Sequence, residues 1–171
     1  DMKNSWKIFS LRYFNPIGAH HTGLIGENLT GNVNNLFPLI LKSFLGNNRL
    51  LIYGNDWPTF DGTCIRDYIH IEDLAEAHVN SLEKLFSSHN GMLALNLGTG
   101  KGTSVLELIS TFEKVNKCKI PYEFVDKRSG DVAISIADNK KALDLLHWNP
   151  QRTIDDMCVD GWLWQKNIRD S

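Results

Sequence analysis

The sequence predicts an α/β fold, because short apolar runs typical of strands alternate along the chain with longer stretches whose apolar residues recur at helical spacing. Residues 93–97 have the composition of a buried strand, and residues 72–86 carry an apolar helical stripe. The 171 residues can enclose one sizeable core, and no repeat, low-complexity segment or linker divides them.

The individual elements follow from local patterns and stop signals. Strands are predicted over residues 8–14, 50–53, 63–71, 93–97 and 122–125. Helices are predicted over residues 36–45, 72–86 and 104–115, from Asp138 to Leu146, and from Thr153 or Asp155 to about Gln165. Asn34 or Asn35 is the expected N-cap of the first helix, and Gly46 ends it. The patternless stretch 19–35 is predicted to be a functional loop.

The composition excludes several classes of protein. A net charge of −2 and a hydrophobic content of 42% are ordinary for a globular protein and give no basis for nucleic-acid binding. No apolar run approaches the roughly 18 residues of a membrane span, and the first residues lack a signal-peptide pattern. Cys64, Cys118 and Cys158 form no disulfide framework, so we predict a cytoplasmic protein without nucleic-acid or membrane partners.

Patterns for metal binding and nucleophilic catalysis are missing from the sequence. No set of His, Cys and carboxylate residues has metal-ligand spacing, so no metal is expected, and His20-His21 is interpreted as an exposed loop pair. No nucleophile–base pair and no paired carboxylates stand out.

The start of the chain is abrupt. Met2 follows Asp1, and a buried strand is already predicted by Ile8, whereas a native domain usually begins with a frayed end. We therefore expect the chain to be truncated.

The segment Asn96-Leu-Gly-Thr-Gly-Lys-Gly-Thr-Ser104 has two interpretations. A strand, a glycine-rich turn and a helix are typical of a dinucleotide-binding loop. The glycine spacing is not G-x-G-x-x-G, however, and the acidic residue expected about 20 residues later is not clearly present, since Asp126 lies farther on. The pattern favours a structural turn.

Two arginines could hold an anion. Arg66 ends a predicted strand, and a guanidinium fork gives a diphosphate two charge-assisted bonds. Its alternative is a structural ion pair with Asp67 or Asp73. Arg128 could clamp phosphate while Asp131 accepts from ribose hydroxyls, although a solvated charged turn is the usual role of such a loop.

Asparagines offer amide donors at two further points. Asn15 follows an aromatic pair, and Asn35 would bring the free N–H groups of a helix N-terminus near an anion. Both could instead be simple turn or capping residues. Local chemistry thus predicts a cleft for a phosphorylated ligand and no particular reaction.

An ordered series of segments adds a family resemblance. The segments are Leu11-Arg-Tyr-Phe-Asn-Pro-Ile-Gly-Ala-His20, Asn34-Asn-Leu-Phe-Pro38, Tyr53-Gly-Asn-Asp56, Asp61-Gly-Thr-Cys-Ile-Arg-Asp-Tyr-Ile-His70, Asp73-Leu-Ala75, Asn96-Leu-Gly-Thr-Gly100 and Arg128-Ser-Gly-Asp131. Together they span essentially the whole chain and resemble the UDP-glucose 4-epimerases of the extended short-chain dehydrogenase/reductase family. The stretch 53–70 and the Asn-Pro-x-Gly-Ala-His element are specific to these epimerases, whereas Arg-Asp-Tyr-Ile-His is shared among nucleotide-sugar enzymes.

The resemblance implies that residues 1–171 are the C-terminal, UDP-sugar-binding portion of such an enzyme, with the last strands of its Rossmann-like sheet. The NAD-binding N-terminal domain would be absent. These enzymes interconvert UDP-glucose and UDP-galactose: NAD transiently oxidises C4 of the hexose, and the hydride returns to the other face. The full-length protein is expected to be a homodimer.

The resemblance also implies roles for residues on the cofactor and sugar sides. It places Tyr13 and Phe14 against the nicotinamide end of NAD. Asn15, Asn35 and Leu36 would hold the diphosphate and sugar.

The uridine end is assigned in the same way. Leu51 and Tyr53 would flank the uracil, and Tyr68 would line the same wall. Arg66 and Arg128 would clamp the diphosphate.

Two further positions follow from the resemblance. Asp131 would bind the uridine ribose. Ser135 matches a position that gates substrate size in the family, and a small side chain there leaves room for UDP-N-acetylglucosamine and UDP-N-acetylgalactosamine.

The catalytic pair of the family has no counterpart here, because none of Tyr13, Tyr53, Tyr68 and Tyr122 is followed by a Lys four residues later. No catalytic residue is therefore assigned, and the chain alone is expected to be inactive. The alternatives are another nucleotide-sugar dehydratase, decarboxylase or epimerase, against which the loop 54–63 argues, and a non-catalytic nucleotide-sugar-binding module.

Overall fold

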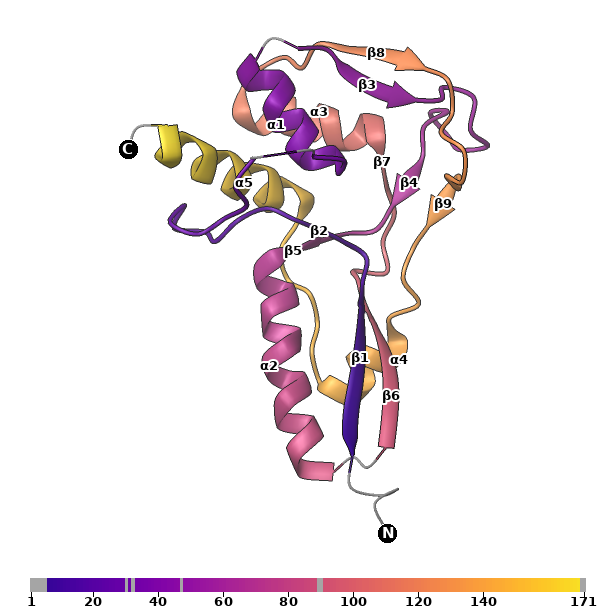
Figure 1. Ribbon diagram of the computed structural model, residues 1–171, viewed down its shortest axis with the longest axis vertical. Helices are drawn as coiled ribbons and strands as arrows, with labels where there is room; N and C mark the ends of the chain where they lie inside the picture. Colours follow the sequence, from indigo (N-terminus) through magenta and orange to yellow (C-terminus); the bar gives the residue numbers. More distant parts are fainter. Residues whose placement is uncertain (1–5, 30, 32, 47, 89–90, 170–171) are drawn as a thin grey trace.

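A computed structural model describes residues 6–29, 31, 33–46, 48–88 and 91–169 of the protein (Figure 1). The elements in chain order are β1 (Lys7–Tyr13), β2 (Asn15–Ile17), α1 (Leu36–Gly46), β3 (Leu50–Tyr53), β4 (Ile65–Arg66), β5 (Tyr68–His70), α2 (Ile71–Ser88), β6 (Gly91–Leu97), β7 (Thr103–Ser104), α3 (Val105–Asn116), β8 (Tyr122–Val125), β9 (Ile134–Ser135), α4 (Lys140–Leu146) and α5 (Ile154–Arg169). Strands and helices alternate, and three of the small sheets pair their strands in parallel, so the predicted α/β class is confirmed.

One hydrophobic cluster surrounds the parallel pair β1–β6, at the end of the molecule where β1 begins (Figure 1). α2 packs against β1, and α4 packs against β6. Leu95 and Leu97 of β6 are buried there together with Ile69 of β5. Both strands run toward the middle of the molecule, so their carboxyl ends point at the remaining elements.

A second cluster is formed where α1, α3 and α5 meet the parallel pair β3–β8 (Figure 1). Phe112 of α3 is fully buried, and its ring meets that of Phe37 edge-on with centroids 6.0 Å apart. Ile40 and Ile52 close the same core from α1 and β3. This packing fixes the position of α1 beside β3.

The single strand predicted over residues 63–71 is wrong, because the structure divides it in two. β4 pairs with β7 and β9, whereas β5 pairs with β2 in another sheet. The chain changes sheets at Asp67, which is completely buried and accepts hydrogen bonds from backbone N–H groups of two other segments. A local pattern cannot show this change, since the residues involved still alternate.

The presence of the helices was predicted better than the residues at which they begin. α4 begins at Lys140 with Asn139 as its N-cap, so the expected cap Asp138 is wrong. For α5, Thr153 rather than Asp155 is the cap, because the Asp156 N–H donates to Thr153 Oγ1 at 3.2 Å. The two-residue strands β7 and β9 were not predicted, since so short a strand has no readable period.

Within the described ranges, the helices are too short or too polar to cross a membrane.

Candidate functional site

A groove on the side of β3 and β4 collects nine of the sequence-predicted ligand residues around a cavity of about 160 Å³. Its lining comprises Asn15, Asn34, Asn35, Leu36, Leu39, Leu51, Ile52, Tyr53, Cys64, Arg66, Tyr68, Val105, Arg128 and Asp131. The residues come from six parts of the chain that are far apart in sequence. We call this set the nucleotide groove below.

Strand alternation explains how one wall of the nucleotide groove is made. Side chains two residues apart in an extended chain point to the same side, and Cys64, Arg66 and Tyr68 all line the cavity. Cys64 was not predicted, although its spacing from Arg66 carried the signal. Burial raises the pKa of Cys64 and of Tyr68 above the usual values, so both side chains stay protonated at neutral pH.

The Arg66 guanidinium is held in place at the base of the groove. Its Nη1 donates to the carbonyl oxygens of Ile65 at 2.9 Å and Val132 at 2.8 Å, and its Nη2 lies 3.6 Å from Asp131 Oδ1. The alternative ion pairs are wrong, because Asp67 is engaged by loop amides and Asp73 by Arg152. The Arg66 guanidinium is thus held by two neutral carbonyls and one half-exposed carboxylate. Its remaining N–H groups can donate to an anion.

Arg128 lies directly over the ring of Tyr53, with its Cζ 3.6 Å from the ring centroid. The preceding residue, Lys127, anchors this loop. Its Nζ lies 2.8 Å from Asp56 Oδ1 and is also positioned over the ring of Trp57. Arg128 therefore covers the aromatic face on which a uracil was expected to stack. A base can reach that face of Tyr53 only if the guanidinium moves aside.

The amide side of the groove comes from β2 and the start of α1. The Asn15 N–H donates to the Asp67 carbonyl at 3.0 Å, and the Asn35 carbonyl accepts from the Leu39 N–H at 3.2 Å. Leu36, the first residue of α1, lines the cavity beside them. The N-terminus of α1 therefore lies on the same cavity as the two arginines, an arrangement that suits an anion.

Ser135 is not among the residues that line this cavity. It lies on β9 as the Cα partner of Arg66, and its carbonyl accepts from the Asp67 N–H at 3.1 Å. The structure thus brings Ser135 beside the groove rather than into it.

Tyr13 and Phe14 lie where the parallel pair β1–β6 ends, the usual ligand edge of such sheets. Tyr13 is half-exposed, and its hydroxyl lies 2.7 Å from His78 Nε2. His78 Nδ1 faces the Leu74 carbonyl, which can only accept, so Nε2 accepts the proton of Tyr13. This bond fixes the Tyr13 ring beside α2.

The glycine-rich turn 98–102 is a structural turn. The N–H groups of Thr99 and Gly100, which a phosphate would need, donate to the buried carboxylate of Asp67 at 2.8 and 2.9 Å. A side chain at Gly98 would meet Ala137 and Asp67 at 2.6–2.7 Å, so the glycine is needed for close packing. The two N–H groups at the centre of this turn are therefore already used by Asp67 and are not available to a pyrophosphate.

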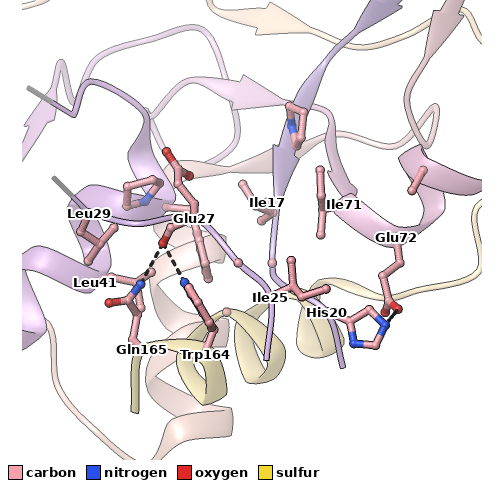
Figure 2. A pocket seen from close by; sticks show the side chains of 17 residues that line it. Ile17, His20, Ile25, Glu27, Leu29, Leu41, Ile71, Glu72, Trp164 and Gln165 are labelled. Atoms are coloured by element: carbon pink, nitrogen blue, oxygen red, sulfur yellow. Dashed lines mark hydrogen bonds and ion pairs between the residues drawn. The ribbon is translucent and has the colours of Figure 1, made fainter. Parts of the chain in front are cut away.

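A larger cavity of about 510 Å³ lies between the loop after β2, α1 and α5 (Figure 2). Its walls are mainly apolar, with Ile17, Leu41 and Trp164 among them. None of the twelve sequence-predicted ligand residues lines it. Chemistry rather than size therefore identifies the smaller nucleotide groove as the candidate site.

Comparison with known proteins decides the family. The sequence profile of the NAD dependent epimerase/dehydratase family matches residues 1–98. The chain belongs to this family. Among its curated relatives, a UDP-glucose 4-epimerase of Bacillus subtilis (strain 168) is 50% identical over 165 residues, and one of Drosophila melanogaster is 52% identical over 162 residues.

Solved structures of the family show the same fold. A UDP-glucose 4-epimerase of Bifidobacterium longum, solved in complex with NAD+ and UDP, superposes with a TM-score of 0.90 at 44% identity. A UDP-glucose 4-epimerase of Stenotrophomonas maltophila with bound NAD and formylated UDP-arabinopyranose gives 0.91 at 45%. The resemblance to the extended short-chain dehydrogenase/reductase epimerases is thereby confirmed.

The chain spans about half the length of these relatives. It is matched over 96% and 94% of its own length by the Bacillus and Drosophila proteins, but over 48% and 46% of theirs. The two solved structures are covered to 49% and 48%, respectively.

Proposed function

We propose that the full-length protein containing this chain is a UDP-glucose 4-epimerase, which interconverts UDP-glucose and UDP-galactose through transient oxidation at C4. The observation that carries the proposal is the convergence of Arg66 and Arg128 on one groove. The relatives that match the chain at about half identity carry the same activity in their names. A guanidinium pair beside a helix N-terminus suits a pyrophosphate.

In this proposal, residues 1–171 supply the UDP-sugar half of the enzyme, and an N-terminal domain supplies the NAD half and the Tyr-x-x-x-Lys pair. Arg66 and Arg128 bind the diphosphate, and Asn15, Asn35 and Leu36 line its sugar side. Asp131 binds the ribose, for which it must exchange its contact with Arg66. Leu51, Tyr53 and Tyr68 form the uracil wall after Arg128 moves from the Tyr53 ring to the phosphates.

The residues present fit one side of a nicotinamide site. Tyr13 and Phe14 stand at the carboxyl end of a parallel strand, and the hydrogen bond to His78 holds the Tyr13 ring in place. NAD would supply the hydride acceptor for the C4–H bond. The part played by this chain is to hold the UDP end firmly while contacting the sugar only lightly. The 4-keto sugar must rotate in the site before reduction, so that the hydride returns to its other face.

The proposal also covers the setting in which the enzyme acts. Cys64, Cys118 and Cys158 all carry free thiols, which supports a reducing compartment such as the cytoplasm. We propose that the full-length enzyme works there in galactose metabolism, as a homodimer.

An activity measurement tests the proposal. The full-length protein with NAD is expected to convert UDP-galactose into UDP-glucose at a rate proportional to the enzyme concentration. Residues 1–171 alone are expected to show no epimerase activity. The product is read by nuclear magnetic resonance of the anomeric proton, so that a dehydratase or decarboxylase would reveal a different product. UDP-galactose left unchanged by a preparation that binds UDP would favour the binding-module alternative.

Replacing Ser135 by tyrosine is expected to abolish turnover of UDP-N-acetylglucosamine and to spare UDP-glucose. A phenol at the Cα partner of Arg66 reaches toward the groove and takes the room that an N-acetyl group needs. The ratio of kcat/KM for the two substrates is the measurement. Ser110→Tyr on the exposed face of α3 is the matched control and should leave the ratio unchanged. Equal losses for both substrates would contradict a gating role for Ser135.

A further inference from the structure

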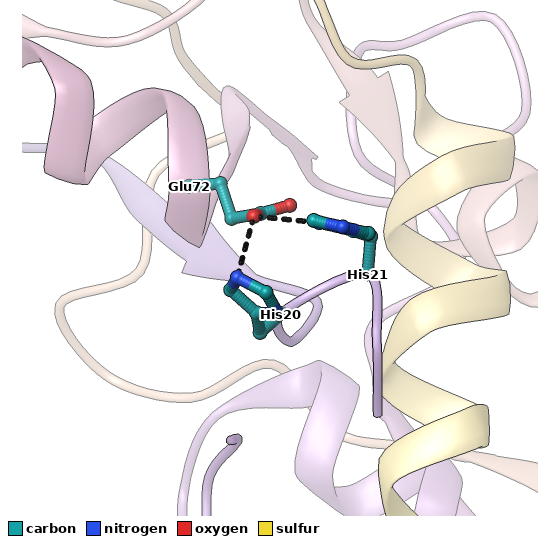
Figure 3. A group of neighbouring side chains, drawn as sticks. All are labelled: His20, His21 and Glu72. Carbon is teal, nitrogen blue, oxygen red and sulfur yellow. Dashed lines mark hydrogen bonds and ion pairs between the residues drawn. The ribbon is translucent and has the colours of Figure 1, made fainter. Parts of the chain in front are cut away.

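A cluster of two imidazoles and a carboxylate joins the loop after β2 to the first turn of α2 (Figure 3). Glu72 Oε1 lies 3.0 Å from His21 Nδ1 and 3.4 Å from His20 Nε2. All three ligand atoms lie within 4.8 Å of one another. Spacing along the chain did not indicate it, because Glu72 lies 51 positions after His21.

We propose that His20, His21 and Glu72 form a binding site for a divalent transition metal ion of the zinc type. The inference goes beyond the epimerase activity and does not depend on it. It also opposes our expectation that the protein holds no metal, which rested on spacing along the chain.

The distances suit such an ion. Zinc bonds of about 2.0–2.1 Å at tetrahedral angles hold ligand atoms roughly 3.3 Å apart. The separations of 3.0 and 3.4 Å from Glu72 Oε1 lie on either side of that value. Two nitrogens and one oxygen select zinc, cobalt, nickel or copper over magnesium and calcium, which prefer oxygen ligands. A fourth position remains for water.

The surroundings hold the ligands in position. His20 Nδ1 lies 2.8 Å from Thr22 Oγ1 and accepts from the Thr22 N–H at 3.3 Å, and these contacts orient the ring with Nε2 toward Glu72. Glu72 Oε2 forms an ion pair with Arg152, whose Nε lies 3.1 Å away, but among the described residues it accepts no hydrogen bond.

The local charge also favours a cation. Arg152 contacts three carboxylates, those of Glu72, Asp73 and Glu76, so its single positive charge leaves an excess of negative charge. The cluster closes one end of the large apolar cavity, where His20 faces Glu72 (Figure 2). A bound ion would therefore pin the loop after β2 to α2.

Metal titration of the full-length protein tests the site. After removal of metals with a chelator, Zn²⁺ is titrated by calorimetry, and Co²⁺ is titrated with its visible absorption as a sign of tetrahedral coordination. His21→Ala and His20→Ala are each expected to weaken Zn²⁺ binding at least tenfold and to remove the cobalt band. His21 is well exposed at 63%, so its removal should not disturb folding.

His147→Asn is the control, since His147 is an exposed imidazole outside the cluster at a left-handed position that asparagine tolerates. It should bind Zn²⁺ as the wild type does. The proposal is overturned if the wild type shows no saturable binding. It is overturned equally if His21→Ala binds as tightly as the wild type, or if the control weakens as much as the cluster variants.

Discussion

Replacing Asp67 by alanine is expected to lower the free energy of unfolding by about 4 kcal/mol, since each buried N–H left without an acceptor costs about 1–3 kcal/mol. The carboxylate is completely buried and accepts from the N–H groups of Thr99, Gly100 and Ala137 at 2.8, 2.9 and 3.1 Å. It also accepts from Thr99 Oγ1 at 2.7 Å. Urea unfolding of the full-length protein, followed by tryptophan fluorescence, measures the loss.

Two variants sharpen this experiment. Asp67→Asn keeps the volume and one acceptor oxygen, so it should lose roughly half as much. Asp138→Ala removes an exposed carboxylate one residue from Ala137 and should change stability by less than about 0.5 kcal/mol. A loss below about 1 kcal/mol for Asp67→Ala would show that Asp67 does not hold the three segments together.

Replacing Arg66 by methionine is expected to weaken UDP binding to the full-length protein about 100-fold, because two charge-assisted hydrogen bonds of about 1.5–3 kcal/mol each are lost. Arg66→Lys keeps the charge but not the fork, so an intermediate loss of about tenfold is expected. Calorimetric titration with UDP gives both values. Arg49→Met, an exposed arginine paired with Glu123, is the control and should bind UDP within about twofold of the wild type.

The pair of arginines can be tested together. If Arg66 and Arg128 hold the same pyrophosphate, the double variant should lose less than the sum of the two single losses, with a coupling energy of about 0.5–3 kcal/mol. Strictly additive losses would mean that the two guanidinium groups act on separate parts of the ligand. Unchanged UDP affinity in both single variants would remove the basis for the proposed nucleotide groove.

Local sequence patterns predicted much of this structure. β3 and β8 have the predicted bounds, and α2 and α3 differ from prediction by two residues or fewer at each end. These elements have a clear period and clear stop signals. The grouping of ligand residues in one groove required the family resemblance as well, because nothing local says that Arg66 and Arg128 meet.

Other features depend on contacts between distant residues and were beyond local patterns. The division of the predicted strand at Asp67 results from hydrogen bonds to residues 32 to 70 positions later. Ser135 was assigned by resemblance alone, and its place beside Arg66 follows from the pairing of β4 with β9. The stacking of Arg128 on the ring of Tyr53 was likewise not predicted. It depends on contacts between two separate loops, such as the ion pair between Lys127 and Asp56.

The contact between α5 and the loop after β2 has a consequence for synthesis of the protein. The Glu27 carbonyl accepts from Trp164 Nε1 at 2.8 Å and Gln165 Nε2 at 3.1 Å, residues that leave the ribosome 137 and 138 positions later. During translation the segment around Glu27 cannot make these contacts until Trp164 and Gln165 have emerged. This segment, which precedes Asn35 and the groove, therefore settles late relative to its own synthesis.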